Sequence, residues 1–290
     1  MKSNIFLFTG VGFIGLNLIR ILKKNFSIKI FGKIVKYPFK LKFPKNNLDL
    51  IEGDYLDIQK LHKYNFKNSN VILTTASSNK KDFFDKYKMF VKFLNNKNPR
   101  KVILISSVSV YGNEYPKISL LNDYAKNCYK IENICKKHIK KLIILRAANI
   151  FGILRIKPGL LEKLSLQYLN IKKFKLYKYN IIRSYMPVDE LCFIIKSFLS
   201  SKIKNGIYNV SNSSYFFDIK KILTFYEIFY KKKIKILRNK IKPIILNSKI
   251  RPSKSILLLK YPKSKSFLYE VALINNFYKD FLIKKKIYRL

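Results

Sequence analysis

The chain has 290 residues, of which 48% are hydrophobic, and its 60 basic and 16 acidic residues give a formal net charge of +44. This hydrophobic content excludes a disordered chain, and the length suffices for one large domain or two modest ones with a buried core. Three cysteines make no disulfide framework, and the two histidines lie far apart in the sequence, so we expect no metal site.

The positive charge comes mainly from lysine, which occurs 52 times against eight arginines. The lysines are spread along the whole chain, and Lys, Asn, Ile, Phe and Tyr, which have AT-rich codons, are abundant together. A chain selected to bind nucleic acid would concentrate its charge and use arginine for bidentate contacts. We therefore interpret the charge as compositional and expect no specific nucleic-acid partner. A basic nucleic-acid-associated protein stays an alternative that salt-dependent retention of RNA would reveal.

The first element in chain order is an apolar, strand-like run over residues 4–9, followed by a glycine loop and an amphipathic segment. The loop has the G-x-G-x-x-G spacing of a dinucleotide-binding fingerprint, between a strand and a helix as that fingerprint requires. The first glycine permits a tight turn, the second lets backbone amides approach a pyrophosphate, and the third lets the helix pack close to the strand. The start of the helix adds N–H groups and the positive end of its dipole. The pattern predicts a dinucleotide site formed by Gly10, Gly12, Phe13, Ile14 and Gly15.

The same segment could be interpreted as a signal peptide or a membrane anchor. Residues 5–19 are too few for a confident span, contain three glycines and Asn17, and show no small-residue cleavage site. No other stretch reaches ~18 apolar residues. We therefore expect a cytoplasmic protein without membrane insertion.

Short apolar runs alternate with amphipathic segments over the first half of the chain. The expected strands are 4–9, 27–31, 48–52, 70–75, 101–106 and 142–146, and the expected helices are 13–24, 57–64, 82–95 and 123–139. This alternation predicts a Rossmann-type, doubly wound parallel α/β sheet. Further along, prolines interrupt a looser pattern. We expect a dinucleotide-binding domain over residues 1–155 and a smaller C-terminal substrate-binding region over 156–290.

Three further segments stand at the ends of predicted strands or at the start of a predicted helix, where ligands of open α/β sheets bind. Residues 105–112 read I-S-S-V-S-V-Y-G, residues 124–132 read Y-A-K-N-C-Y-K-I-E, and residues 145–152 read L-R-A-A-N-I-F-G. Together with the glycine loop, these segments resemble the extended short-chain dehydrogenase/reductase superfamily, in particular its NAD-dependent epimerase/dehydratase family. The resemblance spans residues 4–215 and includes the segments 53–57, 183–191 and 206–210.

The resemblance implies an NAD(P)-dependent epimerase or reductase that acts on a nucleotide-activated sugar, with a role in surface polysaccharide synthesis. In this family a tyrosine moves the proton of a sugar hydroxyl and a serine orients its oxygen. Tyr124 matches the tyrosine and Ser107 matches the serine. Free tyrosine has a pKa near 10, so it is a poor base at neutral pH unless a cation lies nearby.

Two departures from the family pattern bear on the reaction. The family carries a lysine four residues after the tyrosine, which binds the nicotinamide ribose and lowers the tyrosine pKa, but this chain has Cys128 there. The resemblance implies that Cys128 lies at the ribose end of the cofactor. A neutral thiol supplies no charge, so a catalytically degenerate dinucleotide-binding protein is an alternative to the enzyme. The acid pair of the family's dehydratases is replaced by Val108 and Ser109, which disfavours 4,6-dehydration.

The remaining positions concern the two ligands. Lys33 stands where NAD-binding members carry an acidic residue, so NAD and NADP both stay open as cofactors. Asp54 and Tyr55 belong to a segment similar to the family's adenine-contacting G-D-x-x-D. On the substrate side we expect Asn149 and Arg183, with Arg183 contacting a diphosphate. Relatives often pair through two helices, so the resemblance also implies a homodimer. The sugar, the nucleotide and the stereocentre stay open.

Overall fold

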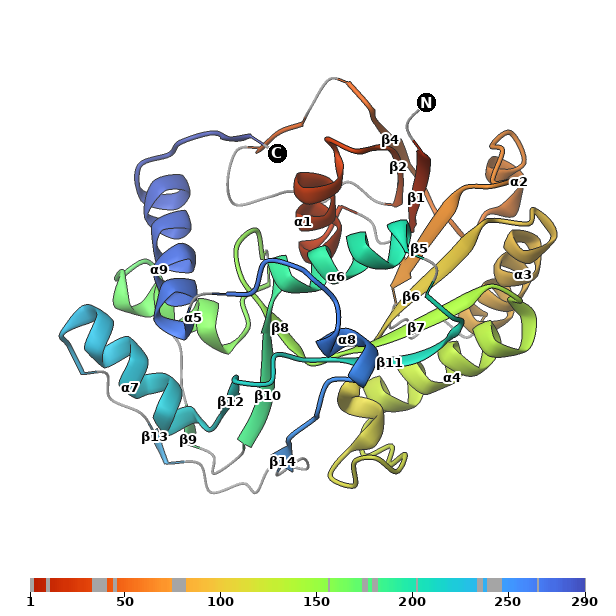
Figure 1. Ribbon diagram of the computed structural model, residues 1–290. Coiled ribbons are helices and arrows are strands. Elements are labelled where there is room, and N and C mark those ends of the chain that lie inside the picture. The colour runs from red at the N-terminus through yellow and green to blue at the C-terminus, as the bar shows by residue number, and fades with distance from the viewer. Residues whose placement is uncertain are drawn as a thin grey trace.

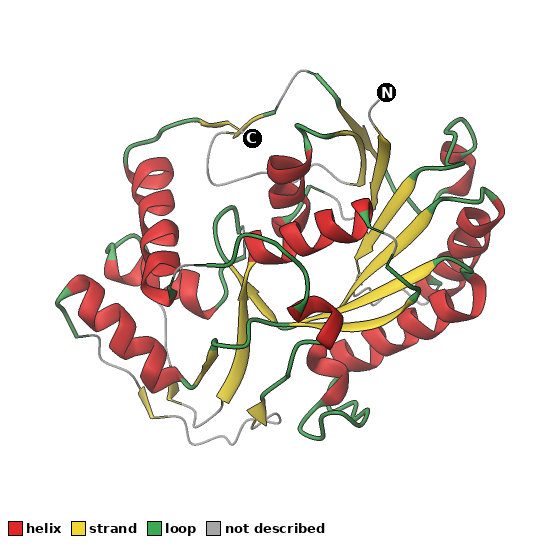
Figure 2. Ribbon diagram, in the orientation of Figure 1, coloured by secondary structure: helices red, strands yellow, loops and turns green. Residues whose placement is uncertain are grey.

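The structure, a computed structural model, has helices on both sides of a twisted sheet and a further group of helices beside it (Figures 1 and 2). It describes residues 3–8, 11–32, 41–43, 46–74, 82–155, 157–173, 177–178, 182–201, 203–233, 237–238, 247–264 and 266–289.

A seven-stranded sheet forms the centre of the described structure. Its strands are β1 (Ser3–Phe8), β2 (Phe26–Gly32), β4 (Leu48–Glu52), β5 (Asn70–Thr74), β6 (Lys101–Ser107), β7 (Leu142–Ala147) and β11 (Gly206–Val210). The strand order is β11-β7-β6-β5-β1-β2-β4, and neighbouring strands run parallel. The chain builds outward from β1 in one direction and then from β5 in the other. In doubly wound sheets, ligands bind outside the carboxyl ends of the strands at this reversal.

Different helices cover the two faces of this sheet. They are α1 (Phe13–Leu22), α2 (Ile58–Leu61), α3 (Phe83–Asn96), α4 (Asp123–His138) and α6 (Val188–Ser200). Helices α1 and α6 contact each other, as do α3 and α4, and Figure 1 shows the two pairs on opposite sides of the sheet. Side chains of β1 alternate between the faces, because Ile5 and Leu7 belong to one core cluster and Phe6 and Phe8 to the other.

The remaining elements lie mostly in the second half of the chain. They are β3 (Leu41–Lys42), η1 (Val108–Tyr111), β8 (Asn149–Phe151), α5 (Leu160–Tyr168), β9 (Tyr177–Lys178), β10 (Ile182–Pro187), β12 (Phe216–Phe217), α7 (Ile219–Tyr230), β13 (Leu237–Arg238), β14 (Asn247–Ser248), α8 (Lys254–Leu257), α9 (Phe267–Tyr278), η2 (Lys279–Ile283) and β15 (Tyr288–Arg289). Strand β8 pairs with β10, and α9 contacts both α5 and α7. The division at residue 155 stays a prediction. The central sheet itself draws on both ranges, because β11 pairs with β7.

The predicted Rossmann-type fold is confirmed, and all six predicted strands and four predicted helices are present. The largest difference is α2, which covers only Ile58–Leu61 of the predicted 57–64. Beyond it Asn65 accepts a hydrogen bond from the backbone N–H of Lys67, a local turn that competes with helix. None of the helices in the described ranges is long and apolar enough to cross a membrane.

Three carboxylates and an arginine interact where α9 meets the layer of α1 and α6. Arg20 of α1 is hydrogen-bonded to Asp189, and Glu190 accepts the backbone N–H of Ser264 at 2.8 Å. Burial raises the pKa of Glu270 on α9 to about 7, with a smaller upward contribution from Asp189 and Glu190, against the lowering effect of Ser264 and Arg20. Glu270 is therefore a buried titrating group near Arg20, Asp189 and Glu190.

Replacing Glu270 by glutamine should remove a pH dependence of the folding stability. The pKa in the folded chain lies above the ordinary 4.5, so the unfolded chain ionises first and the free energy of unfolding falls between about pH 4.5 and about pH 7. At pH 8 we expect Glu270→Gln to raise the free energy of unfolding by about 2–3 kcal/mol. Denaturant unfolding at pH 5 and pH 8 measures this, with the exposed Glu52→Gln as control. An unchanged pH dependence would contradict the assignment.

Candidate active site

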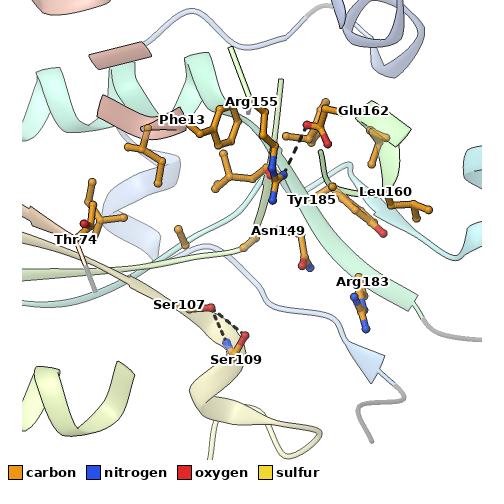
Figure 3. A pocket seen from close by; sticks show the side chains of 18 of the residues that line it. Phe13, Thr74, Ser107, Ser109, Asn149, Arg155, Leu160, Glu162, Arg183 and Tyr185 are labelled. Atoms are coloured by element: carbon orange, nitrogen blue, oxygen red, sulfur yellow. Dashed lines mark hydrogen bonds and ion pairs between the residues drawn. The ribbon is translucent and has the colours of Figure 1, made fainter. Parts of the chain in front are cut away.

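A cavity of about 430 Å³ lies at the carboxyl ends of the central strands (Figure 3). Its wall runs from the first residues of α1, past β6 and α4, to β8, α5 and β10. Six of the residues predicted from the sequence line it together, namely Phe13, Ile14, Ser107, Tyr124, Asn149 and Arg183. Segments that are far apart in the sequence therefore meet in one space.

The dinucleotide side of this cavity is the start of α1. The helix begins directly after Gly12, whose backbone is extended (φ −103°, ψ −169°) and whose carbonyl accepts the N–H of Leu16 at 2.9 Å. Gly12 has no side chain with which to cap this end, and the first turn holds no acidic residue. Gly15 is buried against the sheet. The N–H groups of the first turn and the dipole of α1 suit an anion at this end.

The predicted adenine side lies away from the cavity. Asp54 is exposed after β4, and its carboxylate accepts the backbone N–H of Leu56 at 3.0 Å. Tyr55 packs against Phe8 and Phe90, with ring centres 5.8 and 5.4 Å apart, and burial raises its pKa well above the ordinary value. Their roles in cofactor binding stay predictions. The predicted contacts at Gly10 and Lys33 lie outside the described residues.

Ser107 ends β6 and begins the short helix η1. Its Oγ accepts the backbone N–H of Ser109 at 3.1 Å and donates to the Ser109 hydroxyl at 3.0 Å (Figure 3). The serine is thus fixed as a cap at a strand end while it lines the cavity. Val108 is buried, so of the two positions that replace the dehydratase acid pair only Ser109 reaches the cavity.

Tyr124 lies in the first turn of α4, which Asn122 caps by accepting the backbone N–H of Ala125 at 2.8 Å. Its side chain is 47% exposed and lines the same cavity as Ser107. A second tyrosine, Tyr185 of β10, also lines the cavity, but burial raises its pKa to about 12. Burial thus makes the ionised form of Tyr185 rarer than that of a free tyrosine, and the exposed Tyr124 is the better candidate for proton transfer.

Cys128 is buried one turn further along α4. It packs in an apolar cluster with Val108, Val110, Tyr111 and Ile250, and it is not among the residues that line the cavity. Cys128 is therefore buried and is not one of the described residues that line the cavity. Its assignment to the cofactor stays a prediction.

A buried polar network that the sequence analysis missed lies behind Ser107. Glu132 accepts two hydrogen bonds from Arg146, at 3.0 and 2.6 Å, and one from Ser106 at 2.7 Å. Arg146 also donates to the Tyr111 hydroxyl at 2.9 Å, and Tyr111 donates to Asn209 at 2.7 Å. Burial lowers the pKa of Arg146, but the bonds to Glu132 and Tyr111 outweigh it and keep the guanidinium charged. The network joins the ends of β6, β7 and β11 to α4.

On the opposite side of the cavity β8 and β10 position the predicted substrate residues. Asn149 donates from Nδ2 to the carbonyl of Ser184 at 3.0 Å, so part of its side chain holds the strand pair together. Arg183, next to Ser184, lines the cavity at the start of β10 (Figure 3). Arg155 and Glu162 line it as well, although the sequence pattern singled out neither of them.

Comparison with known proteins relates this geometry to known folds. No protein-family model matches the chain. Among curated proteins, GDP-6-deoxy-D-talose 4-dehydrogenase from Aggregatibacter actinomycetemcomitans is 24% identical over 212 residues, which cover 69% of this chain and 71% of the relative.

Solved structures match over almost the whole chain. A dTDP-glucose 4,6-dehydratase from Bacillus anthracis, in complex with NAD, has a TM-score of 0.80 and 17% identity and covers 98% of this chain and 100% of its own. WbmG from Bordetella bronchiseptica, in complex with NAD and UDP, has a TM-score of 0.81 and 15% identity, with 99% of each chain covered. A UDP-glucuronic acid 4-epimerase from Bacillus cereus has a TM-score of 0.79 and 19% identity, covering 96% of this chain and 99% of its own. The chain has the fold of these enzymes.

These structural neighbours are NAD-dependent epimerases and dehydratases of the extended short-chain dehydrogenase/reductase family. The resemblance inferred from the glycine loop and the serine and tyrosine segments is thereby confirmed at the level of the fold. The roles of single residues depend on this chain's own cavity.

Proposed function

We propose that the protein is an NAD(P)-dependent epimerase or reductase acting on a nucleotide-activated sugar. The observation that carries this proposal is the single cavity that joins the start of α1, the pair Ser107 and Tyr124, and the polar side chains Asn149 and Arg183. The named activities of the structural neighbours and of the curated relative support it. A homodimer and a cytoplasmic location stay predictions.

The chain's own residues fit a nicotinamide dinucleotide. The uncapped first turn of α1, with Gly12 before it, offers backbone N–H groups to a diphosphate. Phe13 and Ile14 form the cavity wall on that side, and Ser107 and Tyr124 stand further along. When bound, the nicotinamide supplies a hydride acceptor and donor.

In this proposal Tyr124 exchanges the proton of a sugar hydroxyl and Ser107 orients the oxygen. Ser107 and Tyr124 line one cavity, which supports a shared substrate oxygen for the two hydroxyls. The planar guanidinium of Arg183 can donate hydrogen bonds to a diphosphate. Asn149 uses one N–H for Ser184, and its other amide groups can bind the substrate. The sole carboxylate among the described lining residues is Glu162, which is fully buried on α5. Glu132, behind Ser107, does not line the cavity and is hydrogen-bonded to Arg146 and Ser106, so neither acid is placed to protonate a departing hydroxyl. We therefore propose epimerisation or ketone reduction and not 4,6-dehydration.

The direct test is an incubation of the purified chain with NAD or NADP, in both redox states, and a panel of nucleotide sugars. We expect a change in nicotinamide absorbance for a reductase, or a new sugar stereoisomer by NMR for an epimerase. Tight binding of dinucleotide and nucleotide sugar without any product would favour the second candidate, a catalytically degenerate binding protein. The observation that favours that candidate is Cys128, which lies buried where the family has its lysine.

Replacing Gly12 by valine should weaken dinucleotide binding. A side chain directly before α1 blocks the approach of a diphosphate to the backbone amides. We expect the Kd to rise about tenfold or more, equivalent to the loss of at least one charge-assisted hydrogen bond. Calorimetric titration with NAD and NADP measures this, and circular dichroism checks the fold. Failure of the unaltered chain to bind either dinucleotide would refute the proposed function.

A further inference from the structure

Arg155 stands at the junction between α1 and the segment that follows β8. Its Nη1 donates to the carbonyl of Ile150 at 2.6 Å, and its Nε donates to the carbonyl of Lys157 at 3.1 Å. The guanidinium carbon lies 5.0 Å from the centre of the ring of Phe13, the first residue of α1. Nη2 makes no hydrogen bond within the described part of the chain, and the side chain is 30% exposed. Arg155 therefore has donors left at the cavity.

The buried carboxylate of Glu162 fixes this arginine. Its side chain is fully buried, Oε1 accepts the backbone N–H of Gly152 at 3.0 Å, and Oε1 lies 3.6 Å from Nη1 of Arg155. Oε2 has no hydrogen-bond partner among the described residues. The ion pair with Arg155 offsets the cost of burying this carboxylate, so Glu162 favours the observed position of Arg155.

Gly159 leaves the space in which this pair lies. A Cβ atom at that position would come within 2.7 Å of Arg155 Nη1 and 2.9 Å of Glu162 Oε2. Real Cβ atoms do not approach this closely, so a larger residue would displace the arginine or the carboxylate. The local sequence is thus consistent with a fixed ion pair at the cavity.

A second contact ties the segment that carries Arg155 to α1. Asn17 is fully buried in α1, and its Nδ2 donates both to the carbonyl of Phe13 at 2.9 Å and to the carbonyl of Ile153 at 3.0 Å. The segment is therefore anchored to the first turn of α1, the anion-binding end of the helix. Figure 3 shows Arg155 beside Phe13 and Glu162, with Arg183 on another side of the cavity.

We propose that Arg155 binds the diphosphate of the dinucleotide at the start of α1 and that Glu162 is its positioning residue. This inference rests on the proposed function, because it presupposes a dinucleotide in the cavity. A nucleotide sugar carries the same diphosphate chemistry. The contacts of Arg155 to Phe13 and of its segment to Asn17 favour the dinucleotide, whereas Arg183 lies on β10 and suits the nucleotide sugar.

The test is calorimetric titration of the full chain, at physiological salt, with the preferred dinucleotide and separately with UDP and GDP. Arg155→Gln should weaken dinucleotide binding about 10- to 100-fold, the worth of a hydrogen bond to a charged group, and leave nucleoside diphosphate binding unchanged. Arg183→Gln should do the reverse. Lys157→Gln is the matched control, because it removes one charge from an exposed neighbouring side chain and should change neither affinity.

The positioning role of Glu162 is tested by a double-mutant cycle. Glu162→Gln keeps an acceptor for Gly152 but removes the charge that holds Arg155, so it should weaken dinucleotide binding less than Arg155→Gln does. The double variant Arg155→Gln/Glu162→Gln should bind no more weakly than Arg155→Gln alone. Arg155→Gln leaves a buried carboxylate without its cation and could therefore fail to fold. In that case the double variant, which removes both charges, is compared with the unaltered chain instead.

The outcomes separate this inference from the proposed function. Equal dinucleotide affinity for the unaltered chain, Arg155→Gln and the double variant would overturn the inference alone. A loss of UDP or GDP binding in Arg155→Gln, with dinucleotide affinity unchanged, would also overturn it and assign the arginine to the substrate. If the unaltered chain binds neither NAD nor NADP, the proposed function fails and the inference fails with it.

Discussion

Tyr124→Phe should reduce turnover about 10²- to 10⁴-fold on the substrate that the assay identifies, because it removes the one hydroxyl proposed to exchange the sugar proton. The side chain is 47% exposed, so the substitution should leave stability nearly unchanged. The other cavity tyrosine, Tyr185, is the poorer candidate for a base, because burial raises its pKa to about 12 and makes its ionised form rarer. Steady-state kinetics should therefore show a loss in kcat with a small change in KM.

Tyr129→Phe is the matched control for this prediction. Tyr129 lies on the same helix, packs against the cluster around Cys128 and does not line the cavity. Loss of its hydroxyl should leave kcat within about twofold, as expected for a substitution away from the reacting groups. Full turnover by Tyr124→Phe would show that another group transfers the proton.

Much of the fold could be predicted, because the strands and helices of this sheet have recognisable sequence patterns. Strands buried on both faces are continuous apolar runs, such as residues 102–105 of β6. The amphipathic segments between them form helices of nearly the predicted length, except for the shorter α2. The position of β11 was harder to predict. Its five residues pair with β7 only after the chain has built β8, α5, β10 and α6, and a crossover of that length cannot be derived from local patterns.

The candidate site likewise has residues that the sequence predicts and residues that only the folded structure reveals. Ser107 and Tyr124 belong to short motifs with fixed spacing, so the sequence identified both, and the structure places them at one cavity. Arg155 and Glu162 belong to no motif. Their proposed roles follow from the contact of Arg155 with Phe13 of α1 and from the ion pair between the two residues, and both exist only in the folded chain. Glu162 also lies within an ordinary amphipathic helix, where a single acidic residue most often faces solvent. The complete burial of Glu162 is what indicates its role. Composition and periodicity cannot predict that one particular charged residue is buried.

The apolar environment of Cys128 agrees with the ordinary behaviour of a buried cysteine as a small hydrophobe, and it sharpens the question of catalysis. The described residues that line the cavity include no lysine, and the cations among them are Arg155 and Arg183. Arg146 is charged but is committed to Glu132 and Tyr111 in the buried network. If the protein is active, Tyr124 works without the family's lysine.

Cys128→Lys should raise kcat at neutral pH about tenfold or more and move the rising limb of the pH profile to lower pH. A lysine at this position lies one helical turn from Tyr124, and its stem can follow the apolar cluster while its ammonium reaches the cavity edge. A cation within about 4–6 Å of the phenol favours the ionised form, so the tyrosine pKa falls and more of the base is available. Cys128→Met fills similar space without a charge, so it should leave the pH profile unchanged. Identical pH profiles for the lysine and methionine variants, with both folded, would show that a positive charge at this position does not control proton transfer by Tyr124.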